Sequence, residues 1–163
     1  MNTKNLYTFL IINFFLSVLF YSSVVAQSIP PFKMLLTNGR TFYAKDLPHQ
    51  KPVVIIYFSP DCEHCQTLMN AFFKKINDFK STEIIMVTFR PLNEVAGFEK
   101  SYQTYKYPNI IVGTEMPAFF FEMYYNLMNT PFTVLYDKQG KYFYSYRKET
   151  PIEDLVMRVK LLK

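Results

Sequence analysis

The chain has only two cysteines, Cys62 and Cys65, which stand three positions apart in the stretch YFSPDCEHCQTLM. Such a pair fits a structural disulfide, part of a metal site or a redox-active dithiol. A disulfide between them would close a very small loop and would constrain the unfolded chain little. A structural zinc site needs four ligands, and the chain offers only His49 and His64 as further candidates. The spacing therefore favours a redox pair, with no metal and no other cofactor.

The two cysteines are expected to have different roles. Cys62 falls where a helix should begin after a buried strand, and the N–H groups at a helix N-terminus stabilise a thiolate and lower its pKa. Cys65 lies one helical turn later on the same face, so we expect it to be more buried. Cys62 would then attack, or be attacked, at the surface, and Cys65 would resolve the mixed disulfide. His64 could stabilise the thiolate and Glu63 could oppose it; alternatively, both are ordinary solvent-facing residues.

The elements around this pair alternate between strands and helices. Residues 53–59, VVIIYFS, form a continuous apolar run that is typical of a strand buried on both faces. Apolar side chains at three- and four-residue steps then predict a helix from Cys62 to Phe79. Further on we expect a strand over 83–89, a helix over 93–106, a short strand over 109–113 and a helix that opens with Pro117.

The two ends of this region indicate antiparallel structure. Residues 34–47 predict a strand, an Asn38-Gly39 turn and a second extended piece, and residues 130–148 predict a hairpin. A last helix should follow with Thr150 as its N-cap and Pro151 in its first turn. This order predicts an α/β sandwich with a mixed central sheet flanked by helices.

Residues 1–26 are predicted to be a targeting segment rather than part of the fold. Lys4 is followed by an uncharged run from residue 6 to Ala26, and the small residues Val24 and Ala26 fit a signal-peptidase site after Ala26. The alternative is an uncleaved membrane anchor, because the run is long enough to span a bilayer. Residues 27–163 would then form one domain outside the cytoplasm, most simply in the periplasm, where disulfides persist.

Composition limits the other classes of function. The net charge is +5, but the basic residues are scattered among acidic ones and accompany no nucleic-acid-binding motif. Half of the residues are hydrophobic and 18% are aromatic, so the chain can bury a sizeable core. We therefore expect a globular domain that binds no nucleic acid.

The strand VVIIYFSPDCEHC and the dipeptide Thr130-Pro131 before FTVLYDKQGK resemble the thioredoxin superfamily, in particular its secreted TlpA-like and redoxin-like thiol–disulfide oxidoreductases. The similarity covers residues 33–163. It implies a thioredoxin-like three-layer sandwich in which a cis Thr130-Pro131 bond faces the cysteines and extended substrate binds beside it. It also implies partners: protein thiols and disulfides of the same compartment, and a membrane-bound or soluble redox partner.

The sequence departs from that family at several positions. Asp61-Cys-Glu-His-Cys replaces Trp-Cys-Gly-Pro-Cys, and the central histidine is similar to that of more oxidising disulfide isomerases. The buried acid that thioredoxins carry six residues before the first cysteine is Ile56 here. The glutamate that cytochrome-maturation relatives carry three residues after the second cysteine is Leu68. The base that would deprotonate Cys65 is therefore unassigned, and Asp61 and Glu63 are candidates only by proximity.

Two other functions fit parts of the pattern. A redoxin-type peroxidase places a serine or threonine three residues before its reactive cysteine, as Ser59 stands before Cys62, and uses an arginine for which Arg147 is a candidate. A non-catalytic binding module would use the Thr130-Pro131 face and leave the cysteines passive. Rapid peroxide consumption would favour the first alternative, and the absence of measurable disulfide exchange would favour the second.

Overall fold

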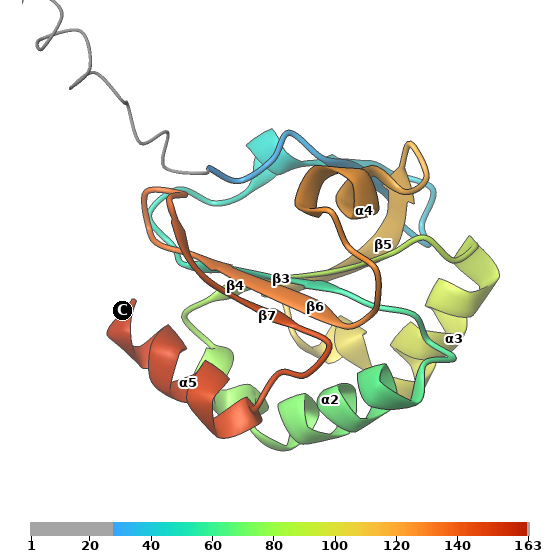
Figure 1. Ribbon diagram of the computed structural model, residues 1–163. Coiled ribbons are helices and arrows are strands. Elements are labelled where there is room, and N and C mark those ends of the chain that lie inside the picture. The colour runs from blue at the N-terminus through green and yellow to red at the C-terminus, as the bar shows by residue number, and fades with distance from the viewer. Residues whose placement is uncertain (1–27, 163) are drawn as a thin grey trace, which may run out of the picture.

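The centre of the molecule is a seven-stranded sheet with the order β2-β1-β5-β4-β3-β6-β7 (Figure 1). The computed structural model describes residues 28–162. The strands are β1 (Lys33–Leu35), β2 (Thr41–Tyr43), β3 (Val53–Tyr57), β4 (Glu83–Thr88), β5 (Ile110–Met116), β6 (Phe132–Tyr136) and β7 (Tyr142–Arg147). The α-helices are α2 (Glu63–Lys74), α3 (Leu92–Tyr102), α4 (Phe120–Tyr125) and α5 (Ile152–Leu161). Three 3-10 turns are η1 (Ala44–Asp46), η2 (Ile76–Phe79) and η3 (Thr104–Lys106).

The sheet is mixed, as the sequence predicts. Strand β3 pairs in parallel with β4, which pairs in parallel with β5, whereas β6 runs antiparallel to β3. The hairpin partner β7 extends the sheet beyond β6, and β1 extends it antiparallel to β5 on the other side. All five residues of β3 are buried because β3 lies inside the sheet, between β4 and β6, with a packed layer on each face.

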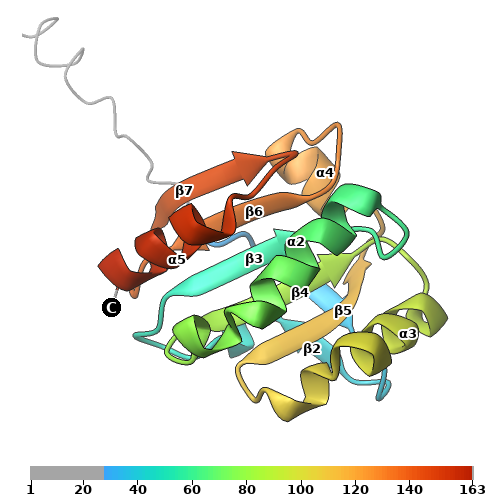
Figure 2. The ribbon, with the colours of Figure 1, turned by 90° about the horizontal axis from the view of Figure 1, so that it is seen from below.

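The two faces of the sheet carry separate apolar clusters, so the fold has three layers. Helices α2, α3 and α5 lie across one face, and α4 with the N-terminal lead-in lies on the other (Figures 1 and 2). Side chains alternate along β3: Ile56 packs with Leu68 of α2 on the first face, and Ile55 packs in the cluster with Phe121 of α4 on the second. The apolar, β-branched strand is thus held between two helical layers.

The predicted N-terminal hairpin is confirmed as β1 and β2, and Gly39 in its turn has a φ of 80°. The hairpin packs closely on β5 at Gly113. A Cβ at Gly113 would lie 2.7 Å from the carbonyl oxygen of Leu35 and 2.9 Å from Cε of Met34. This position therefore has no room for a side chain.

The predicted β6–β7 turn is also confirmed. Asp137 accepts backbone N–H bonds from Gln139 and Lys141 at 2.9 Å each, and Gly140 has a φ of 74°. The Ile29 N–H donates to the Gly140 carbonyl at 3.1 Å, which fixes the start of the described chain at this end of the sheet.

The helix predicted to open with Pro117 is wrong in its bounds. The bond between Met116 and Pro117 is cis, and α4 begins only after Phe119, which has a φ of 63°. The helix ends after six residues at Asn126, which has a φ of 50°. Residues with positive φ interrupt a helix at both ends, so the segment makes a short helix between two turns.

The N-terminus of the last helix also differs from the prediction. Pro151 is the N-cap residue of α5, and no side chain caps the helix. The Thr150 hydroxyl is instead paired with the Thr133 hydroxyl of β6 at 2.9 Å. The predicted signal segment, residues 1–26, lies outside the described residues and stays a prediction. Within residues 28–162, no helix combines the length and apolar character needed to cross a bilayer.

Candidate functional site

Cys62 lies at the junction of the buried strand β3 and the helix that follows it. Strand β3 ends at Tyr57, and the chain reaches Cys62 through a turn in which the Cys62 N–H donates to the Ser59 carbonyl at 3.1 Å. Cys62 is the N-cap residue of α2, and its carbonyl accepts the Gln66 N–H at 2.9 Å. The predicted position at a helix N-terminus is confirmed.

Cys65 sits in the first turn of α2 and faces the core. Its side chain is 1% exposed, whereas Cys62 is partly exposed, and both are free thiols. Burial raises the pKa of Cys65 to about 12, although the Ser59 N–H contributes in the opposite direction at 3.5 Å from the sulfur. The predicted difference in burial between the two cysteines is therefore present.

The environment of Cys62 lowers its pKa. Partial burial is the largest single influence and acts to raise it, but hydrogen bonds outweigh this effect. They come from the Cys65 thiol, the Thr130 side chain and the backbone N–H groups of Cys65 and His64. Because these donors stabilise the thiolate, a larger fraction of Cys62 is ionised at neutral pH than for an ordinary cysteine.

Thr130 and Pro131 lie opposite Cys62, as the resemblance implies. Their peptide bond is cis, and the Cys62 thiol donates to the Thr130 carbonyl oxygen at 3.6 Å. The preceding loop is tied to β7 by Arg147, whose guanidinium donates to the carbonyls of Tyr125 and Asn126 at 2.8 and 3.1 Å. Segments that are distant in sequence thus meet at the sulfur of Cys62.

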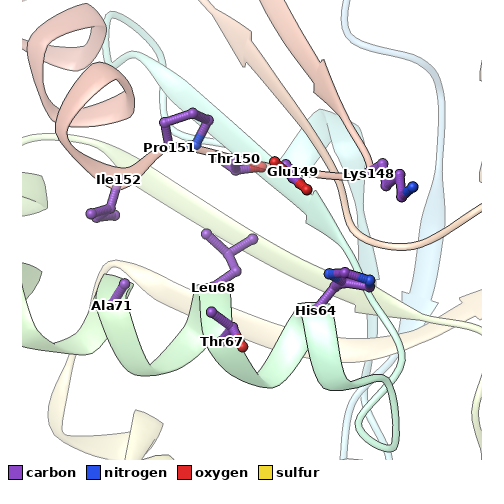
Figure 3. A pocket seen from close by; sticks show the side chains of 9 residues that line it. All are labelled: His64, Thr67, Leu68, Ala71, Lys148, Glu149, Thr150, Pro151 and Ile152. Carbon is purple, nitrogen blue, oxygen red and sulfur yellow. The ribbon is translucent and has the colours of Figure 1, made fainter.

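His64 and Glu63 are both exposed. The contact through which His64 lowers the pKa of Cys62 comes from its backbone N–H. The His64 ring borders a groove of ≈ 450 Å³ between α2 and the segment that leads into α5, where it lies near Lys148 and Glu149 (Figure 3). A tuning role for the two side chains stays a prediction.

A second hollow, of ≈ 380 Å³, lies directly beside Cys62 and includes residues that sequence reasoning missed. Its walls are formed by Tyr57, Cys62, His64, Phe89, Glu122, Leu127, Met128, Asn129 and Thr130. Glu122 is the one acidic residue in the aromatic run 119–125, which is a signal that could have marked it. The loop after α4 forms one side of the hollow, and Met128 in this loop is 87% exposed.

The groups proposed for peroxide chemistry are engaged elsewhere. The Ser59 hydroxyl donates to Asp61 in the same turn, and Asp61 also pairs with Arg90 at 3.5 Å. Arg147 makes its described hydrogen bonds to the two carbonyl oxygens at the end of α4. Across residues 28–162, no three histidine, cysteine or acidic side chains gather where they could hold a metal ion.

Solved structures with the same fold include several thiol proteins. A secreted disulfide oxidoreductase of Mycobacterium tuberculosis, described as homologous to E. coli DsbE, is 18% identical, with 81% of this chain and 96% of that chain covered and a TM-score of 0.67. An exposed lipoprotein thioredoxin of Streptococcus pneumoniae is 18% identical, with 82% and 100% covered and a TM-score of 0.61. A thioredoxin-like protein of Porphyromonas gingivalis is 20% identical, with 82% and 90% covered and a TM-score of 0.66.

These likenesses confirm the thioredoxin-like fold, while no curated protein sequence matches the chain. The sequence profile of the AhpC/TSA family matches residues 25–160. With most of its length matched, the chain belongs to the AhpC/TSA family, and its Cys62–Cys65 pair lies at the start of α2.

Proposed function

We propose that the protein exchanges disulfides with cysteine pairs of other proteins outside the cytoplasm. Cys62 is the sulfur that meets the substrate, and Cys65 is the sulfur that resolves the mixed disulfide. The observation that carries this proposal is the unequal state of the two thiols. Cys62 is partly exposed and has a lowered pKa, whereas Cys65 is 1% exposed and has a pKa of about 12.

When the protein acts as a reductant, the exchange takes place in two steps. The Cys62 thiolate attacks one sulfur of a substrate disulfide, and the other substrate sulfur leaves with the electron pair and takes up a proton. Cys65 then loses its proton and attacks the sulfur of Cys62, which releases the second substrate sulfur and leaves a Cys62–Cys65 disulfide. In reverse, the oxidised pair introduces a disulfide into a reduced substrate.

Thr130 and Pro131 are proposed to bind extended substrate beside the reactive sulfur. The Thr130 carbonyl lies 3.6 Å from the Cys62 sulfur, and Thr130 also borders the hollow next to it. A substrate strand in the hollow would therefore contact Thr130 as well as Cys62. The exposed side chains of His64 and Glu63 are proposed to tune the pair from the solvent side.

The proposed location is the periplasm, after cleavage of a signal peptide following Ala26. Support comes from the residue pattern of positions 1–26 and from structural neighbours that are a secreted protein and an exposed lipoprotein. In that compartment a membrane-bound or soluble redox partner would return the cysteine pair to its working state.

The test is to trap the substrate. Cys65→Ser should accumulate a mixed disulfide between Cys62 and its protein substrates, which a reducing agent releases, because the resolving thiol is absent. Cys62→Ser should abolish exchange, and the double variant should trap nothing. If Cys65→Ser traps no partner while the wild type still exchanges disulfides, the assigned roles are wrong. Rapid consumption of hydrogen peroxide by the reduced wild type would instead support a peroxidase.

A further inference from the structure

The hollow beside Cys62 combines apolar walls with a single acid. Phe89 and the loop residues Leu127 and Met128 supply apolar side chains, and Glu122 is the acid. No lysine or arginine of the described chain lines this hollow. Because Cys62 lines it as well, whatever enters the hollow lies next to the reactive sulfur. The hollow can therefore discriminate between substrates by the residues that neighbour their cysteine.

The carboxylate of Glu122 has no cation as a partner in the described chain. The one hydrogen bond described for it comes from the Tyr57 hydroxyl at 3.2 Å, and the same hydroxyl donates to Glu115 at the shorter distance of 2.9 Å. Across residues 28–162, no lysine, arginine or histidine forms an ion pair with Glu122. Its side chain is partly exposed, so a group in the hollow can reach it. A carboxylate among apolar walls attracts a cation more strongly than one in open water does.

The groups behind Glu122 do not neutralise its charge. Burial raises the pKa of Tyr57 most strongly, and the charges of Glu115 and Glu122 raise it further, so the phenol keeps its proton and donates it in hydrogen bonds. Glu115 is 2% exposed and is occupied by the N–H groups of Phe119 and Phe121 at 2.8 and 2.9 Å. The negative charge of Glu122 can thus be compensated only by solvent or by a group that enters the hollow.

The shape of the hollow suits one long basic side chain. Its volume of ≈ 380 Å³ is at the lower end of the range for ligand pockets. Lysine and arginine lay their methylene groups along apolar surface while the charged head reaches a polar partner. A guanidinium can also stack on the ring of Phe89 and bind a carboxylate through two parallel hydrogen bonds, which an ammonium group cannot do. Arginine should therefore fit the hollow better than lysine.

We propose that Glu122 determines specificity by selecting substrates that carry an arginine or lysine next to the reacting cysteine. This inference rests on the proposed function and names the substrate class of the same site. The substrate cation pairs with the Glu122 carboxylate, its methylene groups pack against Phe89 and Met128, and the neighbouring sulfur meets Cys62. The chemical step is unchanged: the bond from Cys62 to one substrate sulfur forms as the substrate S–S bond breaks.

The test compares two peptide disulfides that differ in charge. They are the symmetric disulfides of acetyl-arginyl-cysteinyl-arginine amide and of the same peptide with citrulline, the neutral analogue of arginine, in both flanking positions. The readout is the ratio of their reduction rates by the reduced protein, arginine over citrulline. This ratio should be at least about five-fold higher for the wild type than for Glu122→Gln, which is the scale of a charge-assisted contact. Added salt should lower the wild-type ratio, because it screens a partly exposed pair.

Glu149→Gln is the matched control, because it removes one carboxylate from the neighbouring groove of Figure 3 instead of from this hollow, and its ratio should equal that of the wild type. If Glu122→Gln keeps the wild-type ratio, or if Glu149→Gln lowers the ratio to the same extent, the inference is overturned while the proposed function stands. If the wild type reduces neither disulfide, the proposed function itself fails.

A binding measurement tests the inference without a variant and without a thiolate. The oxidised wild-type protein is titrated with the two peptides in which serine replaces cysteine, and the NMR signal of the Met128 methyl group is followed. The arginine peptide should reach half of its shift at a concentration at least about five-fold lower than the citrulline peptide does. Because the oxidised pair carries no thiolate, attraction to Cys62 cannot cause this difference. Equal titrations, or no shift with either peptide, refute the inference even if Glu122→Gln does not fold.

Discussion

Removing the Cys65 thiol should raise the pKa of Cys62. Among the hydrogen bonds that lower this pKa, the one from the Cys65 side chain is the largest. A hydrogen bond to a charged group contributes about 1.5–3 kcal/mol, and one pKa unit corresponds to about 1.4 kcal/mol. Since a thiol is a weak donor, Cys65→Ala should raise the pKa of Cys62 by about one unit.

The assay is the ultraviolet absorbance of the thiolate, together with the rate of alkylation by iodoacetamide, measured as a function of pH. In the wild type the alkylation rate should fall only when the pH drops below the lowered pKa of Cys62. In Cys65→Ala the fall should begin at a higher pH. Cys65→Ser keeps a hydroxyl donor and should stay closer to the wild type. An unchanged or lower pKa in Cys65→Ala, or equal shifts in both variants, would refute the reasoning.

Two further predictions concern the scaffold. Gly113→Ala should lower the free energy of unfolding by about 1–3 kcal/mol in urea titrations, because the new methyl meets a β1 carbonyl oxygen at 2.7 Å. Gly97→Ala, in an open position of α3, should instead be neutral or stabilising, and equal effects would contradict the packing argument. Arg147→Ala should lower the free energy of unfolding by about 1–2 kcal/mol, because the carbonyls of Tyr125 and Asn126 lose their donor. It should also slow disulfide exchange, because these carbonyls begin the loop that leads to Thr130. Arg147→Lys should keep only part of the stability and part of the exchange rate. An unchanged exchange rate in Arg147→Ala would show that the loop does not depend on this contact.

The sequence was sufficient to predict the elements whose structure depends on neighbouring residues. The apolar run that forms β3 and the amphipathic pattern of α2 place Cys62 at the helix N-terminus without any knowledge of distant residues. The turn at Asp137–Gly140 is likewise determined by neighbouring residues, because Asp137 accepts a backbone N–H within the turn and Gly140 adopts a positive φ. The position of Cys62 at the start of α2, with Cys65 one turn later on its buried side, follows from the patterns of β3 and α2.

The bounds of the short helix α4 could not be predicted, because a buried side chain of the preceding strand decides where the helix starts. Aromatic residues occupy nearly every position around it, so no apolar face marks its bounds. The carboxylate of Glu115, at the end of β5, accepts the N–H groups of Phe119 and Phe121 and so holds the start of the helix. Phe119 adopts its positive φ in this arrangement.

Contacts between residues far apart in the sequence explain why other residues were missed. An acid in the strand at Glu115 and another in the aromatic run at Glu122 are visible in the sequence, but their common partner, Tyr57, is 58 residues from the first and 65 from the second. Thr150 also resembled a helix cap, but a threonine of β6 provides its hydrogen bond instead. Pairings across the sheet are not encoded in spacing.

The pairing of Ile29 with Gly140 bears on how the protein could be handled as a reagent. The β6–β7 turn lies at the Val53 end of β3, whereas Cys62 follows the Tyr57 end. A spacer attached ahead of Ser28 would therefore meet the domain on the side remote from its dithiol. Protein coupled in this way to a bead or an electrode should present its sulfurs outward, so that immobilisation does not block access by large polypeptides.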